Sequence, residues 1–148
     1  MKRILIATDG SAGGREAVEQ GLALAAATDA RATLVYVRKP PLPIVGDACY
    51  QRVLSVRSRH ARQIVEDAAA RATELGVEAE HEVLEGDAAE RIVEFARLCD
   101  SDVIVVGSRA LGSIAGTLLG SVSRTVVDTA DRPVLVVTGR LSERREAA

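Results

Sequence analysis

The chain contains four short runs of almost entirely apolar residues, separated by longer mixed segments. These runs cover residues 4–7, 32–37, 103–106 and Val134–Val137. Apolar runs of this length without alternation are typical of β-strands that are covered on both faces. The pattern therefore predicts four buried strands.

Residues 77–84 follow a different pattern, in which apolar and charged residues alternate. Glu78, Glu80 and Glu82 fall on one face, and His81 lies among the less polar residues of the other. A period of two with one charged face predicts a strand that is exposed on one side. Because acidic side chains discourage pairing with other chains, we expect this fifth strand at an edge of the sheet.

The segments between the strands repeat apolar residues at helical spacing. Helices are expected over residues 11–28, 49–75 and 87–99, and onward from Val122. Asp87 and Glu90 have the spacing of a capping box, and Gly76 stands where a helix C-terminal cap belongs. Strict alternation of strand and helix predicts a single α/β domain with an open parallel sheet.

Composition narrows the classes of partner. A net charge of −2 and an aromatic content of 2% argue against nucleic-acid binding, which relies on cationic surfaces and stacking side chains. No apolar run reaches the length of a membrane span, and Asp9 interrupts the run nearest the N-terminus, unlike a secretion signal. We therefore expect a cytoplasmic protein with neither a membrane nor a nucleic-acid partner.

A glycine- and serine-rich stretch at residues 107–123 is the strongest candidate for chemistry. It follows the buried run 103–106 and precedes a segment with helical spacing. Glycines let a backbone approach a ligand, and a helix N-terminus offers unpaired N–H groups that suit phosphate. The stretch indicates a phosphate cradle, with an ordinary loop as an equally weighted alternative on chemistry alone.

Several better-known sites do not fit this sequence. A P-loop needs a Lys-Ser/Thr pair after its glycines, but the chain has only Lys2 and Lys39, and no glycine-rich segment fits the dinucleotide fingerprint. His60 lies among arginines, which favours a solvated helix face over a ligand site. Asp9 is a candidate ligand for a metal near phosphates, although helix capping is the favoured alternative for it.

Two segments resemble the universal stress protein family. The opening Ile4-Leu5-Ile6-Ala7-Thr8-Asp9-Gly10-Ser11 resembles that family's first strand and turn, and Val105-Val106-Gly107-Ser108-Arg109 with Leu118-Leu119-Gly120-Ser121-Val122-Ser123 resembles its late signature. In nucleotide-binding members the signature is Gly, two residues, Gly, nine residues, Gly, then Ser or Thr. Here Gly107, Ala110 and Gly120-Ser121 occupy those positions, so one glycine is replaced by alanine. The resemblance covers residues 1–139 and leaves a charged tail at 140–148, which is expected to be disordered.

This resemblance implies a five-stranded parallel sheet of order 3-2-1-4-5, with ATP or another adenine nucleotide bound at its crevice. Mg²⁺ is the metal for which Asp9 is a candidate ligand there. The resemblance also implies a homodimer paired through Val134–Val137. The implied nucleotide-binding residues are Ala7, Asp9, Val37, Gly107, Arg109, Ala110, Gly112, Gly120, Ser121, Val122 and Ser123. Among them, Val37 would contact adenine, Gly107 and Arg109 would line the ribose and phosphates, and the last four would hold phosphate. Alanine is strained at Ala110 if that position needs a positive φ, and Gly112 would let the loop re-route.

The leading hypothesis is an ATP-binding sensor or regulator of the stress response. One alternative is a nucleotide-free homodimer that acts through protein contacts, and another is a slow ATPase. The absence of an evident base and of a cradle lysine weighs against the ATPase, because phosphoryl transfer relies on positioned charge. The sequence identifies no protein partner.

Overall fold

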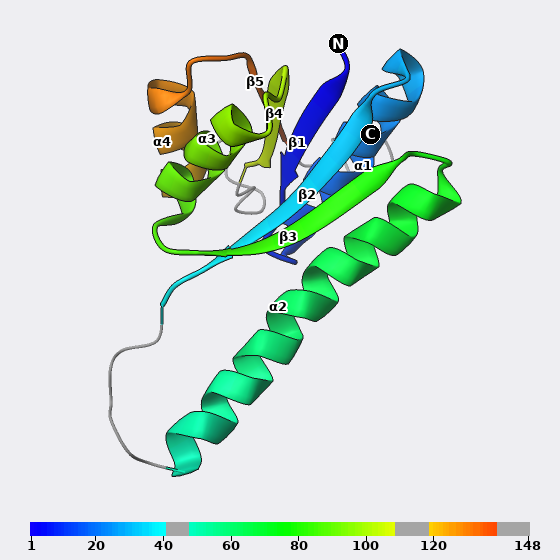
Figure 1. Cartoon of the computed structure of the whole chain (residues 1–148). Helices are drawn as coiled ribbons and strands as arrows, with labels where there is room; N and C mark the ends of the chain where they lie inside the picture. The colour runs from blue at the N-terminus through cyan, green and yellow to red at the C-terminus, as the bar shows by residue number, and fades with distance from the viewer. Residues whose placement is uncertain (41–47, 109–118, 139–148) are drawn as a thin grey trace, which may run out of the picture.

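The computed structural model describes residues 1–40, 48–108 and 119–138, with the side chain of Ala48 not described. Figure 1 shows an open sheet with helices on both faces. The elements in chain order are β1 (Arg3–Ala7), α1 (Ala12–Thr28), β2 (Arg31–Arg38), α2 (Ala48–Glu74), β3 (Ala79–Glu85), α3 (Ala88–Leu98), β4 (Val103–Gly107), α4 (Ser121–Thr129) and β5 (Val134–Val137). Residues 140–148, expected as a disordered tail, lie outside the described part of the chain.

The sheet has the predicted order, β3-β2-β1-β4-β5, and its neighbouring strands are parallel. β1 lies at the centre, where Ile4 is paired with Ala32 of β2 on one side and with Val103 of β4 on the other. β3 forms one edge, as its alternating acidic pattern predicted. The fold is therefore a doubly wound α/β sheet, which agrees with the adenine-nucleotide alpha-hydrolase-like fold that the resemblance implies.

Two apolar layers hold the helices to the sheet. On the face covered by α1 and α2, Ile4, Ile6 and Val105 pack with helix residues such as Leu22 and Ala72. On the face covered by α3 and α4, the alternate strand residues pack with Ile92, Val93, Ala96 and Val126. Successive strand side chains point to opposite faces, so a strand between two helical layers must be apolar throughout. This explains the uninterrupted runs in β1 and β4.

The end of α2 explains why β3 begins later than the alternating pattern suggested. Gly76 has a φ of +68°, its N–H bonds the Thr73 carbonyl at 3.1 Å, and the Val77 N–H bonds the Ala72 carbonyl at 2.9 Å. This pair of bonds is a Schellman motif. Val77 is therefore used in closing the helix, and the strand starts at Ala79.

The start and end of α3 differ in how well the sequence predicted them. Asp87 is the N-cap, and its carboxylate accepts the Glu90 N–H at 3.0 Å, as the capping spacing predicted. Cys99, at the end of the helix expected over residues 87–99, is the half-buried C-cap residue. Desolvation raises the pKa of its thiol, consistent with an unreactive packed cysteine.

Within the described ranges, no helix combines the length and apolar character that crossing a membrane requires.

Candidate functional site

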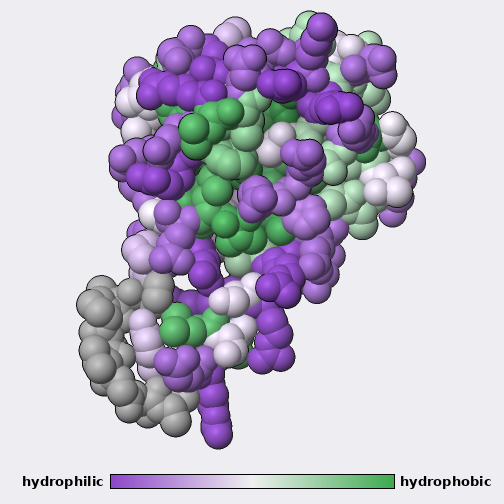
Figure 2. All heavy atoms as spheres, viewed as in Figure 1, coloured by the Kyte–Doolittle hydropathy of each residue, from purple (hydrophilic) through white to green (hydrophobic). Residues whose placement is uncertain are grey.

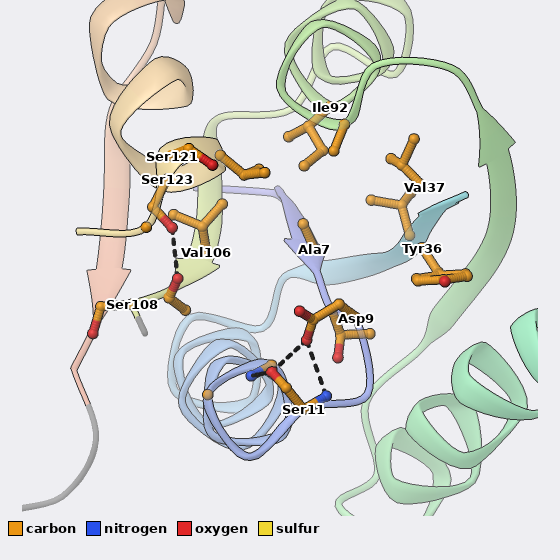
Figure 3. A pocket seen from close by; sticks show the side chains of 18 residues that line it. Ala7, Asp9, Ser11, Tyr36, Val37, Ile92, Val106, Ser108, Ser121 and Ser123 are labelled. Carbon is orange, nitrogen blue, oxygen red and sulfur yellow. Dashed lines mark hydrogen bonds between the residues drawn. The ribbon is translucent and has the colours of Figure 1, made fainter. Parts of the chain in front are cut away.

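A hollow of about 680 Å³, counting its open mouth, lies at the carboxyl ends of β1, β2 and β4. Figure 3 shows its lining side chains between the N-terminal ends of α1 and α4. β1 is followed by α1 on one face of the sheet, and β4 leads to α4 on the other. Ligands of open α/β sheets bind at such a topological switch point.

The structure brings eight of the expected site residues to this one hollow. They are Ala7, Asp9, Val37, Gly107, Gly120, Ser121, Val122 and Ser123. The other three, Arg109, Ala110 and Gly112, lie outside the described residues. Segments separated by more than eighty residues in the chain thus meet where the parallel strands end.

One half of the hollow is apolar and was only partly expected. Val37 reaches it from β2 and Ile92 from α3, while Val106 of β4 lies beside Ser108 and Ser123 on the other side. Figure 3 shows Val37 and Ile92 on the same side of the space. Ile92 was not among the residues expected at the site, because helical spacing shows which face of a helix is apolar but not which residue closes a distant pocket. This half can enclose a flat apolar group.

The other half is polar and is formed mainly by the first turn of α4. Gly120 is the N-cap of that helix, and no side chain caps the first N–H groups. Unpaired N–H groups at a helix N-terminus attract anions. Gly120 has a φ of −59°, a value that any residue adopts, so its backbone conformation does not itself require glycine.

The two serines of this turn have different surroundings. Ser121 is exposed at the hollow. Ser123 is buried, and its hydroxyl donates to the Gly107 carbonyl at 2.6 Å, which ties α4 to the end of β4. Ser121 is therefore the hydroxyl of the pair that is presented to a ligand, and Ser123 supports the wall.

The turn between β1 and α1 forms the opposite wall. Ser11, rather than Asp9, is the N-cap of α1, and its Oγ accepts the Gly14 N–H at 3.1 Å. The Asp9 carboxylate accepts the Ser11 N–H at 2.9 Å and the Ser11 hydroxyl proton. The expectation that Asp9 caps the helix was thus wrong by two residues. Asp9 instead orients the residue that does so.

Close backbone contact between α1 and β4 joins the two walls. A Cβ on Gly13 would lie 2.7 Å from the Ser108 carbonyl oxygen, and a Cβ on Gly14 would lie 2.6 Å from Asp9 Oδ1. A Cβ on Gly107 would overlap the Gly13 carbonyl. The poor helix formers at the start of α1 therefore allow this helix to approach the end of β4.

Asp9 is the one ionisable carboxylate in the described lining, which contains no lysine, arginine or histidine. The described residues also form no group of three or more metal-ligating His, Cys, Asp or Glu side chains. His60 is exposed and lies on α2, outside this hollow. The described lining can hold a ligand through N–H groups, hydroxyls and apolar contacts, but it presents no acid–base pair for turnover.

Comparison with known proteins gives consistent relatives across nearly the whole chain. A universal stress protein of Thermus aquaticus is 35% identical over 137 residues, covering 92% of this chain and 98% of the relative. The structure of a universal stress protein family member from Burkholderia pseudomallei is 30% identical, with a TM-score of 0.75, and the match covers 92% of this chain and 95% of that one.

Two similar structures were solved with adenine nucleotides. One, a universal stress protein in complex with cAMP, is 28% identical with a TM-score of 0.72, covering 92% of this chain and 96% of that one. A second, from Arabidopsis thaliana with AMP bound, is 21% identical with a TM-score of 0.74, covering 97% and 95%. At that lower identity the likeness supports the fold alone.

The Universal stress protein family model matches residues 1–138, which include every described element of the sheet and both walls of the hollow. Sheet order, hollow and sequence match agree, and the chain belongs to the universal stress protein family.

Proposed function

We propose that the protein binds an adenine nucleotide in the hollow between α1 and α4. The observation that carries this proposal is the division of the hollow into an apolar half and a half made of N–H groups and hydroxyls. A nucleotide has the same division, with a flat base at one end and phosphates at the other. The cAMP complex of a similar protein, which is 28% identical to this chain, supports adenine as the base.

Each half of the hollow has a proposed role. Val37 and Ile92 contact the base, while Ser121 and the N–H groups of the first turn of α4 hold phosphate. Asp9 would supply a carboxylate for a ribose hydroxyl or for a Mg²⁺ ion that accompanies the phosphates. Among adenine nucleotides we propose ATP with Mg²⁺, because a single carboxylate becomes a useful metal ligand only when phosphate oxygens complete the coordination.

Thermal unfolding with ATP, ADP, AMP, cAMP and adenosine tests the proposal. A ligand that binds only the native state stabilises it by RT ln(1 + [L]/Kd), or about 2.7 kcal/mol at a hundredfold excess over Kd. We expect adenine nucleotides to raise the melting temperature more than adenosine, and Mg²⁺ to add to the effect of ATP. An unmoved melting temperature with all four nucleotides would contradict the proposal.

The variant Ser121→Glu separates a binding defect from a folding defect. A carboxylate in the first turn of α4 interacts favourably with the helix dipole, yet it repels phosphate in the hollow. We expect the apo protein to melt no lower than wild type and to lose the shift caused by nucleotide. Ala26→Glu adds the same charge on the exposed face of α1 and should keep that shift.

We propose that nucleotide binding serves regulation of a stress response rather than rapid hydrolysis. The described lining has no cation and no acid–base pair, whereas phosphoryl transfer depends on positioned charge. We expect bound ATP to persist over many minutes in single-turnover measurements. Fast hydrolysis that Asp9→Asn abolishes would instead identify an enzyme.

We also propose a homodimer formed through β5. This strand pairs with β4 on one side, carries four consecutive apolar residues, and leaves Leu135 38% exposed. An open apolar edge strand favours pairing with another chain, and a two-fold axis allows the same strand to pair antiparallel with its copy. The opposite edge, β3, instead carries exposed Glu80 and Glu82.

A further inference from the structure

The first half of α2 extends beyond the body of the protein. Figure 1 shows the helix running past the sheet toward its N-terminal end. The buried residues of α2 begin at Ala61 and continue through Val65, Ala68 and Ala72, whereas no residue from 49 to 60 is buried. We call residues 49–60 the arm. A helix of this length gains most of its stability from packing, so the arm lacks the support that the rest of α2 has.

The arm presents apolar side chains to solvent. Val53 is 44% exposed and Val56 is 58% exposed. Figure 2 shows hydrophobic atoms on this protruding part, bounded by hydrophilic ones. A pair of valines three residues apart lies on one helix face and forms a small apolar contact surface.

The helix face that carries Val53 and Val56 continues into a groove between α1 and α2, where it becomes mainly polar. Steps of three or four residues along α2 place further side chains on the same helix face as Val53 and Val56. These side chains line a groove of about 870 Å³ including its mouth: His60, Gln63, Ile64, Asp67 and Arg71. Thr8 and Asp9 border both this groove and the nucleotide hollow, but the two open between different helices. The arm and the groove thus form one elongated surface along α2.

Polar groups in the groove bond mainly to one another. Arg71 Nε lies 2.7 Å from Glu19 Oε1, the Gln63 amide donates to Asp67 at 2.7 Å, and Arg15 donates to the Gly10 carbonyl at 2.7 Å. Val18, Ile64 and Ala68 add apolar lining. An internally paired, partly apolar groove suits a chain segment with its own apolar side chains better than a small ion.

The positive charge of the arm indicates which kind of chain segment would bind there. Arg52, Arg57 and Arg59 are exposed on the arm, and no acidic residue occurs from 48 to 65. All three cations of the arm are arginine, which binds carboxylates in a bidentate way and is enriched at protein interfaces. Pairing of two arms would bring like charges together. We propose that the arm and groove bind an acidic amphipathic helix of another protein.

Two synthetic helical peptides of about four turns test this proposal. Both carry leucine at i, i+3, i+4 and i+7, and the remaining positions are glutamate in one peptide and lysine in the other. We expect fluorescence anisotropy to show binding of the glutamate peptide that weakens with added salt. The lysine peptide should bind at least about tenfold more weakly, since like charges across an interface are repelled.

Matched variants locate the contact. Arg52→Glu with Arg59→Glu, and separately Val53→Ser with Val56→Ser, should each weaken the glutamate peptide at least about tenfold. Arg124→Glu on α4 and Leu98→Ser at the end of α3 change an exposed arginine and an exposed leucine elsewhere, and should bind as wild type does. Circular dichroism of each variant shows whether its fold is retained.

The proposal is overturned if the glutamate peptide does not bind, or if it binds the arm variants as tightly as wild type. It is also overturned if phosphatidylglycerol vesicles or duplex DNA bind through the same arginines while the peptide does not. Concentration-dependent self-association that the valine variants abolish would assign the surface to a second copy of this chain instead.

Discussion

At the scale of single residues, glycines set how closely the two walls of the nucleotide hollow approach each other. Gly13 and Gly107 face each other through backbone atoms, with no room for a Cβ on Gly107. Rigid backbone, unlike the tip of a flexible side chain, cannot move aside cheaply. These positions therefore couple the shape of the site to the stability of the fold.

We expect Gly107→Ala to destabilise the protein by about 1–3 kcal/mol, because the added methyl group forces α1 and β4 apart. For a domain of this size, each kcal/mol lowers the melting temperature by about 2–4 °C. Nucleotide affinity, measured by calorimetry, should fall as well, since the walls of the hollow separate.

Gly76→Ala is the matched control for this effect. Gly76 has a φ of +68° and nothing within 4 Å of its Cβ position, so alanine adds only the strain of left-handed backbone. We expect reduced stability with unchanged nucleotide affinity. If Gly107→Ala also leaves affinity unchanged, the contact between α1 and β4 does not shape the site.

At the scale of elements, charged side chains fasten the end of α3 to the turn before β5. Arg132 donates to the carbonyls of Ala96 at 2.9 Å and Ser101 at 2.6 Å. Asp131 accepts from Arg132 at 2.8 Å and from Arg97 at 3.1 Å. The Arg132 guanidinium, with a smaller contribution from Arg97, lowers the pKa of Asp131 from 3.8 to about 2.

This lowered pKa predicts a pH-dependent contribution to stability. Asp131 loses its proton at a lower pH in the folded protein than in the unfolded chain. Its ionised carboxylate therefore stabilises the folded state above about pH 4, and this stabilisation is lost as the pH falls through about 2. We expect Asp131→Asn to melt below wild type near neutral pH. The difference in melting temperature between wild type and variant should shrink between about pH 4 and pH 2. A difference that stays constant over this range would contradict a stabilising role for the ionised Asp131.

At the scale of the whole molecule, the two edges of the sheet are unlike. Val134 and Val136 pack toward α3 and α4, whereas Leu135 lies on the opposite face of β5 and is partly exposed. A charge at Leu135 therefore disturbs the open edge with less effect on the core than a charge at either valine.

We expect wild-type protein to sediment as a dimer and Leu135→Glu to sediment as a monomer, because antiparallel pairing would bring the introduced carboxylates of two copies together. Leu98→Glu alters an exposed leucine at the end of α3 and should remain dimeric. Circular dichroism should show the fold retained in both. A monomeric wild-type protein at high micromolar concentration would rule out the β5 dimer.

The sequence by itself determined the elements of this protein and much of their arrangement. Uninterrupted apolar runs mark β1 and β4 because each is covered on both faces. The alternating acidic run marks β3 as an edge strand, although His81 is exposed together with Glu80 and Glu82, so the exposure is not confined to the acidic face. Gly76 and Asp87 mark helix ends because their backbone and capping requirements are local. Such features depend on neighbours within a few residues, so periodicity and residue type suffice to find them.

Only the tertiary structure decided which side chains share a surface and what each contacts there. Ile92 joins the hollow from α3, Ser11 replaces Asp9 as the helix cap, and the Ser123 hydroxyl is turned toward Gly107. Val53 on the arm becomes continuous with a groove that α1 completes. These contacts depend on how elements that are distant in the chain pack against one another. The same sequence pattern is compatible with several such contacts, and small differences in the rotation of a helix and in its distance from the sheet decide which one forms.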